Sequence, residues 1–85
     1  MKPSKGWRNP FPGRWVYSSG EHCLVVSFRD ICFDEHPWRI EILDSAKETV
    51  EQAMAVPALA QTLKEHYRTL WRAQLASEMI VNSLI

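Results

Sequence analysis

The last third of the chain constrains the fold most, because residues 58–85 contain neither glycine nor proline. On a helical wheel of about 100° per residue, apolar and polar side chains separate onto opposite sides. The apolar side comprises Leu59, Leu63, Tyr67, Leu70, Trp71, Val81 and Leu84. The polar side comprises Lys64, Glu65, Arg68, Thr69 and Arg72. The pattern predicts one long amphipathic helix from Pro57 to the C-terminus, whose apolar side covers a small sheet, a second copy of the chain or a partner.

Three segments in the first half of the chain have the composition of β-strands. Residues 14–18 and 22–29 are rich in apolar and β-branched side chains, and Ser19-Gly20 between them is typical of a tight hairpin turn. Residues 38–43 alternate between apolar and polar side chains, as a half-buried strand does. We expect these segments to form a three-stranded antiparallel meander.

The predicted hairpin defines which side chains face the core. With Ser19-Gly20 as a two-residue loop, Tyr17 lies opposite His22 and Trp15 lies opposite Leu24. One face then carries the larger side chains: Trp15, Tyr17, His22, Leu24, Val26 and Phe28. We assign this bulkier face to the core; a one-residue change of register would reverse the assignment.

Two helices follow the predicted strands. Ser45 and Glu48 have the spacing of a capping box, which starts a helix by satisfying free backbone N–H groups. Pro57 fits the first turn of a second helix, so the two helices are separated near Ala55-Val56. The order of three strands and then two helices predicts a single α+β domain over residues 14–85, with a small sheet packed by two C-terminal helices.

The charges are unevenly distributed along a chain whose formal net charge is zero. Residues 1–20 carry four basic and no acidic side chains, whereas residues 21–56 carry eight acidic and three basic ones. Prolines and glycines within residues 1–13 predict an irregular basic arm. A protein dedicated to nucleic acid is normally basic overall, so the composition argues against that class except through local contacts.

Cysteine content and hydropathy point to a cytoplasmic protein. The two cysteines, Cys23 and Cys32, do not make a disulfide scaffold. The first residues lack the charged-then-apolar pattern of a signal peptide, and no run of about 18 apolar residues is present. We therefore expect reduced thiols and no membrane partner.

No arrangement of polar residues predicts an active site. A metal site would have to come from His22, Cys23, Cys32 and His36, but adjacent residues of a strand point to opposite faces, so His22 and Cys23 cannot both contribute. Asp30, Asp34 and Glu35 form an acidic loop with His36, which we interpret as a solvated connection because no oxyanion donors accompany it. We expect a non-enzymatic protein without catalytic residues, cofactor or metal.

The leading functional hypothesis is macromolecular binding, with another protein as the partner. Four tryptophans are many for 85 residues, and exposed aromatic and arginine side chains anchor protein interfaces. The candidate contact residues are Trp7, Phe11, Arg14, Arg68 and Arg72. Such a protein would act as a regulator, an inhibitor or an accessory subunit, and a small inhibitor from a phage or other mobile element fits this description.

Three alternatives remain open from the sequence. The basic arm, together with Lys64, Arg68 and Arg72 at helical spacing, could form a nucleic-acid-binding module. The apolar C-terminal helix could instead form a homodimer. A metal-dependent or thiol enzyme would have to use His22, Cys32 and His36.

Overall fold

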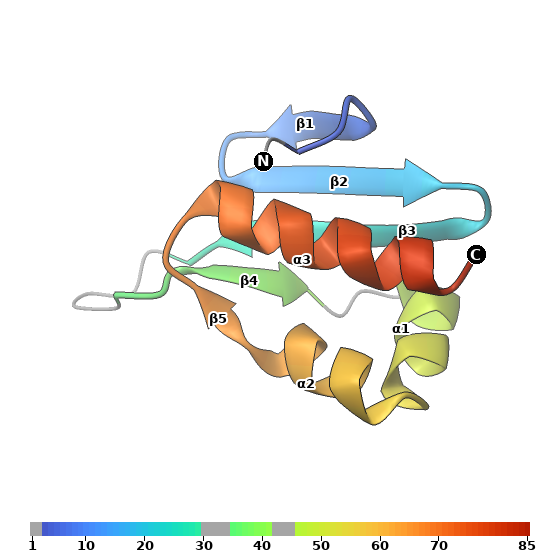
Figure 1. Cartoon of the computed structure of the whole chain (residues 1–85). Coiled ribbons are helices and arrows are strands. Elements are labelled where there is room, and N and C mark those ends of the chain that lie inside the picture. Colours follow the sequence, from blue (N-terminus) through green and yellow to red (C-terminus); the bar gives the residue numbers. More distant parts are fainter. Residues whose placement is uncertain (1–2, 30–34, 42–45) are drawn as a thin grey trace.

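Five strands and three helices make up the part of the chain that the computed structural model describes, residues 3–29, 35–41 and 46–85. In chain order they are β1 (Trp7–Phe11), β2 (Arg14–Ser19), β3 (His22–Phe28), β4 (Trp38–Glu41), α1 (Lys47–Met54), α2 (Pro57–Lys64), β5 (His66–Tyr67) and α3 (Leu70–Ser83). All the strands belong to one antiparallel sheet in the order β1-β2-β3-β4-β5, and α3 lies across it (Figure 1). The α+β class is confirmed; within these ranges the sheet has five strands rather than three, and there are three helices rather than two.

The β2–β3 hairpin forms where the sequence predicts it, but its turn lies one residue later. Ser19 pairs with His22 and Tyr17 with Leu24, so the loop is Gly20-Glu21. Gly20 has φ 62°, which suits the first central position of the two-residue turns that connect antiparallel strands. The predicted pairing of Tyr17 with His22 is therefore wrong. The change shifts the pairing by two residues, so every side chain keeps the face that the sequence predicts.

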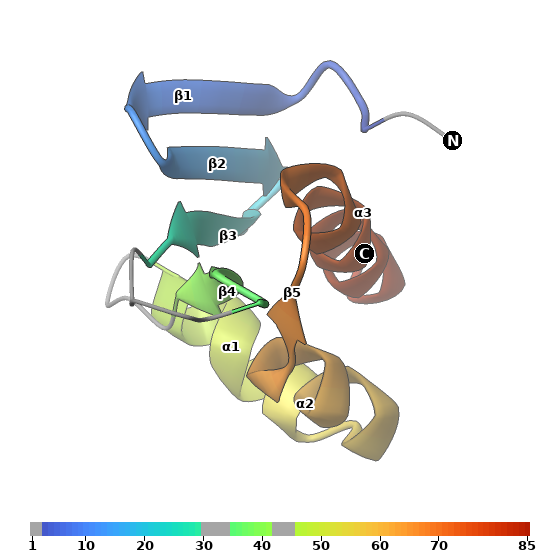
Figure 2. The same cartoon turned by 90° about the vertical axis from the view of Figure 1, so that its left-hand side faces the viewer.

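The predicted core face of the sheet is confirmed at its centre. Tyr17, Leu24, Val26 and Ile40 are buried in one cluster with side chains from all three helices. The helical members of this cluster are Val50, Ala53, Leu59, Leu63, Ala73, Ile80 and Val81. Figure 2 shows α3 on one side of the sheet, with none of the described helices over the opposite side of β1 and β2. The periphery of the predicted face differs, because Phe28 is 44% exposed.

The prediction of one continuous helix from Pro57 onward is wrong. Helix α2 ends at Lys64, and the backbone of Glu65 is extended, with ψ 150°. His66 and Tyr67 then form β5, which pairs with Arg39 and Trp38 of β4, before α3 begins at Leu70.

Strand pairing explains why the helix is interrupted. Without β5, one side of β4 would present unpaired backbone groups, and the pairing satisfies them. The Tyr67 hydroxyl also donates a 2.8 Å hydrogen bond to the carbonyl of Thr62 in α2, which fixes the turn between the two elements. The apolar residues keep a helical spacing on both sides of β5 because side chains from α2 and from α3 pack into the same core.

The N-terminal segment contains a strand where we expected an irregular arm. Residues Trp7–Phe11 pair with β2, with an irregular register between Arg8 and Phe11. The Asn9 side-chain amide bridges this irregularity by donating to the carbonyls of Phe11 (2.8 Å) and Arg14 (2.7 Å). Pro10, which cannot donate to a ladder, lies on this edge strand, where prolines are tolerated.

The helix boundaries near the proline agree with the sequence. Helix α1 ends at Met54 and Pro57 occupies the first turn of α2, which confirms the break at Ala55-Val56. The N-cap of α1 is Ala46, without a side-chain cap hydrogen bond, and Ser45 of the predicted capping box lies outside the described residues. Among the three described helices, none combines the length and the hydropathy that crossing a membrane requires.

Candidate functional site

Aromatic and arginine side chains gather at one end of the sheet, where β1 and β3 end and β2 and β4 begin. The register places Phe11 opposite Arg14 and Phe28 opposite Trp38. Strand β5 continues the row, and the connection to α3 follows it at the same end (Figure 1). We call this region the aromatic–arginine end; it comprises Phe11, Arg14, Phe28, Trp38, Arg68, Trp71 and Arg72. The pairing of Arg14 with Ser27 places Arg14 on the opposite face of the sheet from Phe28 and Trp38.

The rings at the aromatic–arginine end are exposed although they contact their neighbours. Phe11, Phe28 and Trp71 are 59%, 44% and 45% exposed. The Phe28 ring packs edge-on against Trp38, with a centroid distance of 5.1 Å. Two arginines lie over rings: the guanidinium carbon of Arg14 is 6.0 Å from the Phe11 centroid, and that of Arg72 is 5.3 Å from the Trp71 centroid. Cation–π contacts at these distances hold the arginine heads beside the rings.

The structure brings four of the five predicted contact residues to this end. Phe11 and Arg14 lie together at the β1–β2 side, whereas Arg68 and Arg72 line a shared hollow at the β5–α3 side. Trp7 lies elsewhere: its ring packs on Tyr17 at 5.2 Å, and its indole N–H donates a 2.9 Å hydrogen bond to Glu78. Trp7 therefore has a structural role in this arrangement.

Sequence reasoning missed a second group of side chains, the basic residues of β4 and β5. These side chains come together only through the β4–β5 pairing. In β3, β4 and β5, a basic residue adjoins each aromatic residue along the chain: Phe28-Arg29, Trp38-Arg39 and His66-Tyr67. Since successive side chains of a strand point to opposite faces, the basic side chains of β4 and β5 gather on the side away from the rings. These repeated aromatic–basic pairs are the signal that could have identified the site.

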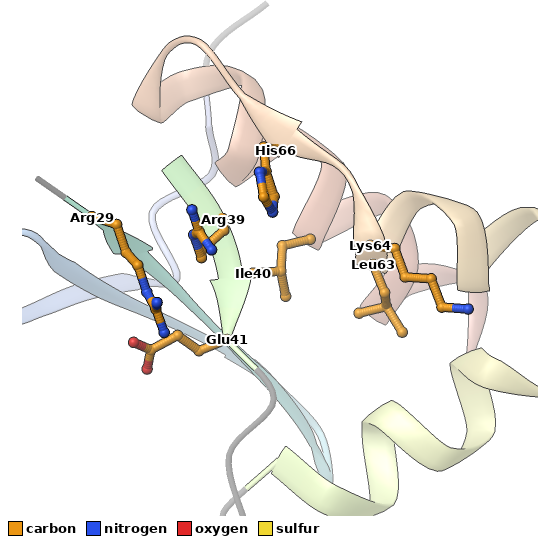
Figure 3. Close-up of a pocket in the computed structure, with 7 residues that line it drawn as sticks. All are labelled: Arg29, Arg39, Ile40, Glu41, Leu63, Lys64 and His66. Atoms are coloured by element: carbon orange, nitrogen blue, oxygen red, sulfur yellow. The ribbon is translucent and has the colours of Figure 1, made fainter. Parts of the chain in front are cut away.

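The basic side chains line an open hollow of about 400 Å³, which we call the basic hollow. Its lining residues are Arg29, Arg39, Ile40, Glu41, Leu63, Lys64 and His66. Figure 3 shows side chains from β4, β5 and the end of α2 around this space, with the side chain of Arg29 extending toward Glu41. The pairing of Arg39 with His66, and of Ser27 with Arg39, extends a polar row across the sheet to Arg14.

Among the described lining residues of the basic hollow, basic side chains outnumber acidic ones. Glu41 carries the one carboxylate among the described lining residues of the hollow. The guanidinium of Arg14, which is not a lining residue, lies 3.3 Å from this carboxylate. Arg29, Lys64 and His66 are exposed to solvent. Glu65, an exposed acidic residue, lies between the lining residues Lys64 and His66 in the chain.

The two histidines considered for a metal site, His22 and His36, do not converge. His22 lies at the start of β3 and contacts the Thr49 hydroxyl at 3.1 Å, whereas His36 precedes β4, near the opposite end of β3. A strand of this length spans about 20 Å, so these two histidines cannot bind one metal ion. Cys32, Asp30 and Asp34 lie outside the described residues. Within residues 3–29, 35–41 and 46–85, no cluster of three histidine, cysteine or acidic residues is suited to a metal.

Comparisons of the chain with protein-family models, with curated proteins and with solved structures found no match. The functional proposals below therefore rest on the described side chains and their arrangement.

Proposed function

We propose that this chain is a non-enzymatic protein that binds another protein through its aromatic–arginine end. One observation carries the proposal: Phe11 and Trp71 are 59% and 45% exposed with arginines over their rings, and Phe28 is 44% exposed. Aromatic and arginine residues contribute most of the binding energy in protein interfaces, particularly where neighbouring groups exclude water. A regulator, an inhibitor or an accessory subunit would use such a surface.

The order within this surface also favours binding. Arg72 already lies over Trp71 and Phe28 already packs on Trp38, so fewer side-chain rotations are lost when a partner docks. Arg68 and Arg72, which are exposed beside Trp71, favour a partner whose surface is acidic. Because such charges mainly affect the association rate, salt should slow binding more than it speeds dissociation.

Nucleic acid is a second candidate, favoured by the polar row Arg14, Ser27, Arg39 and His66 across the sheet. The basic stripe expected on one helix is not present in that form: Lys64 ends α2, Arg68 lies in a connection and Arg72 belongs to α3. A nucleic-acid complex would lose affinity steeply as salt is raised, because phosphate contacts release counterions.

Affinity capture with matched variants tests the protein-binding proposal. A protein captured by the wild-type chain should be lost with Trp71→Ala and Phe28→Ala but retained with Val56→Ala, which alters a similarly exposed apolar residue between α1 and α2. Equal capture by all four proteins would contradict the proposal. A salt-sensitive mobility shift of DNA or RNA, without any captured protein, would favour the second candidate instead.

A further inference from the structure

We propose that the outward side of α3 continues the aromatic–arginine end and binds an acidic amphipathic helix of the partner protein. This inference rests on the protein binding proposed above and names the chemistry of the partner. It follows from an apolar row along α3, from the open space over that row and from the charges at its start.

An apolar row runs along the side of α3 that faces away from the sheet. Trp71, Leu75 and Met79 are four residues apart, so they lie within about 80° of one another around the helix and span about 12 Å along it. Trp71 and Met79 are 45% and 48% exposed, Leu75 is partly exposed, and none of the three belongs to the core cluster. Ala73 and Ile80, on the opposite side of the helix, are fully buried in that cluster. We call these three residues the α3 row; it is apolar surface that the described core does not use.

None of the other described helices and strands covers the α3 row. Figure 1 shows α3 in front of the sheet with its outward side open, and Figure 2 agrees. Exposed apolar side chains that adjoin one another and have polar neighbours mark interaction sites. A straight row of about two helical turns suits a partner helix, whose own apolar side chains recur every three to four residues.

The charges at the start of the α3 row favour an acidic partner. Arg68 and Arg72 are exposed and, with Trp71, line a hollow of about 520 Å³. Glu65 is the one acidic residue among the described lining residues of this hollow, so the two arginines outnumber it. A guanidinium presents paired N–H donors that match the two oxygens of a carboxylate. An acidic side chain of the partner would therefore bind at this end of the row.

The described carboxylates leave both arginines available to a partner. The one ion pair between described residues joins Arg14 to Glu41. Glu78, the one acidic residue of α3, accepts hydrogen bonds from the N-terminal segment instead. Neither Arg68 nor Arg72 is thus paired with a described carboxylate, and an acidic helix would match the arginines and the apolar row together.

Titration of the isotopically labelled chain with three designed peptides of equal length, followed by NMR, tests this contact. The glutamate peptide carries leucines on one side of a helix and glutamates on the other. The lysine peptide has lysines in place of the glutamates, and the scrambled peptide has the composition of the glutamate peptide without its two-sided pattern. The glutamate peptide should shift the Met79 methyl and Trp71 indole resonances and bind about tenfold more tightly than the other two.

Matched substitutions locate the contact on α3. Met79→Ala should weaken binding of the glutamate peptide about tenfold, whereas Met54→Ala, at a methionine of α1 that is 41% exposed, should leave the affinity unchanged. Arg68→Glu combined with Arg72→Glu should make the lysine peptide the tighter ligand. Arg8→Glu, at an exposed arginine of β1, should not. Because misfolding cannot create a new preference, this reversal distinguishes a direct contact from a loss of structure.

Capture of a partner with the same variants separates this inference from the protein-binding proposal. A partner that requires Phe28 and Trp71 but is retained by Met79→Ala and by the double arginine variant would leave protein binding intact and overturn the α3 contact. Capture that is unaffected by Trp71→Ala and Phe28→Ala would contradict the protein-binding proposal, and this inference with it.

Three further results would overturn the α3 contact alone. The first is equal affinity for the glutamate and lysine peptides. The second is self-association of the chain that Met79→Ala abolishes, because a second copy would then occupy the row. The third is tighter binding of an oligonucleotide or of phosphatidylserine vesicles than of the glutamate peptide.

Discussion

Trp7 and Trp71 show how the same side chain acquires two different roles in one small protein. Each lies beside a charged residue: Trp7 donates a hydrogen bond to Glu78, and Trp71 lies under the guanidinium of Arg72. Trp7 packs against the core cluster and against Tyr17, whereas Trp71 is 45% exposed. The packing of each tryptophan, rather than its charged neighbour, therefore determines whether it stabilises the fold or is available for binding.

The two regions also differ in what they connect. The Glu78 carboxylate on α3 accepts hydrogen bonds from the Ser4 backbone N–H at 3.0 and 3.2 Å and from the Trp7 indole at 2.9 Å, so it attaches the N-terminal segment to α3. Among the described contacts, Trp71 makes no such link between distant segments. Its ring contacts Arg72, the next residue in the chain. Changes in the first region should reduce stability, and changes in the second should reduce binding.

The largest effect is expected for Trp7→Ala. Replacing a fully buried tryptophan by alanine costs about 3–5 kcal/mol, and because Trp7 is only half-buried we expect a loss of about 2–3 kcal/mol in the free energy of unfolding. Chemical denaturation followed by circular dichroism measures this loss. A loss of less than about 0.5 kcal/mol in the free energy of unfolding is typical of surface substitutions. Such a small loss would contradict the structural role of Trp7 and its difference from Trp71.

Glu78→Ala should destabilise the protein by about 1–2 kcal/mol, because the Ser4 and Trp7 N–H groups lose a charged acceptor. A double-mutant cycle that combines Glu78→Ala with Trp7→Phe isolates the contact between the two side chains, because each substitution removes the hydrogen bond. We expect the two substitutions to be non-additive. Additive losses of stability would show that Glu78 and Trp7 stabilise the protein independently.

The hydroxyl of Tyr67 provides a pH-dependent test of the β5 segment. Burial, assisted by the negative charge of Glu65, raises the pKa of Tyr67 to about 12. The unfolded chain ionises this group near its ordinary pKa of about 10, so the stabilising contribution is complete below pH 10 and is lost as the pH rises through 12.

Tyr67→Phe removes both the titration and the hydrogen bond to Thr62, and should cost about 1 kcal/mol at neutral pH. Melting temperatures measured between pH 9 and 12 should fall more steeply for the wild-type chain than for Tyr67→Phe. Parallel curves would mean that the hydroxyl ionises as readily in the folded chain as in the unfolded one.

The smallest change in stability is expected for Trp71→Ala. Because this ring is outside the core cluster, the substitution should cost less than about 1 kcal/mol while abolishing partner capture. Thermal unfolding and capture measured on the same preparation check both parts. A destabilisation as large as that of Trp7→Ala would assign Trp71 to the fold and withdraw its proposed role in binding.

Local patterns predicted the central strands well. Alternation and turn chemistry identified β2, β3 and β4, and Pro57 marked the start of α2. The predicted position of the hairpin turn was wrong by one residue. Either Ser19 or Glu21 can stand beside Gly20 in a two-residue turn, and only the strand pairing shows that it is Glu21. The core face survived this error because the pairing shifted by an even number of residues.

Long-range pairing could not be predicted from the same patterns. Tyr67 fits the apolar side of a continuous helix equally well, and its extended conformation depends on β4, which lies almost 30 residues earlier in the chain. Similarly, β1 contains Pro10 and forms only because β2 pairs with it. The predicted contact residues Phe11, Arg14, Arg68 and Arg72 reach the same end of the sheet, but the basic hollow requires the pairing of Arg39 with His66, which no local pattern reveals.

The pairing of β5 with β4 underlies both proposals, because it interrupts the C-terminal helix and leaves Trp71 in the first turn of α3. Nuclear Overhauser effects measured on the labelled chain test this pairing directly. We predict cross-strand contacts between Trp38 and Tyr67 and between Arg39 and His66, with no helical contacts spanning residues 65–69. An unbroken series of helical contacts from Lys64 to Leu70, without the cross-strand contacts, would contradict the account.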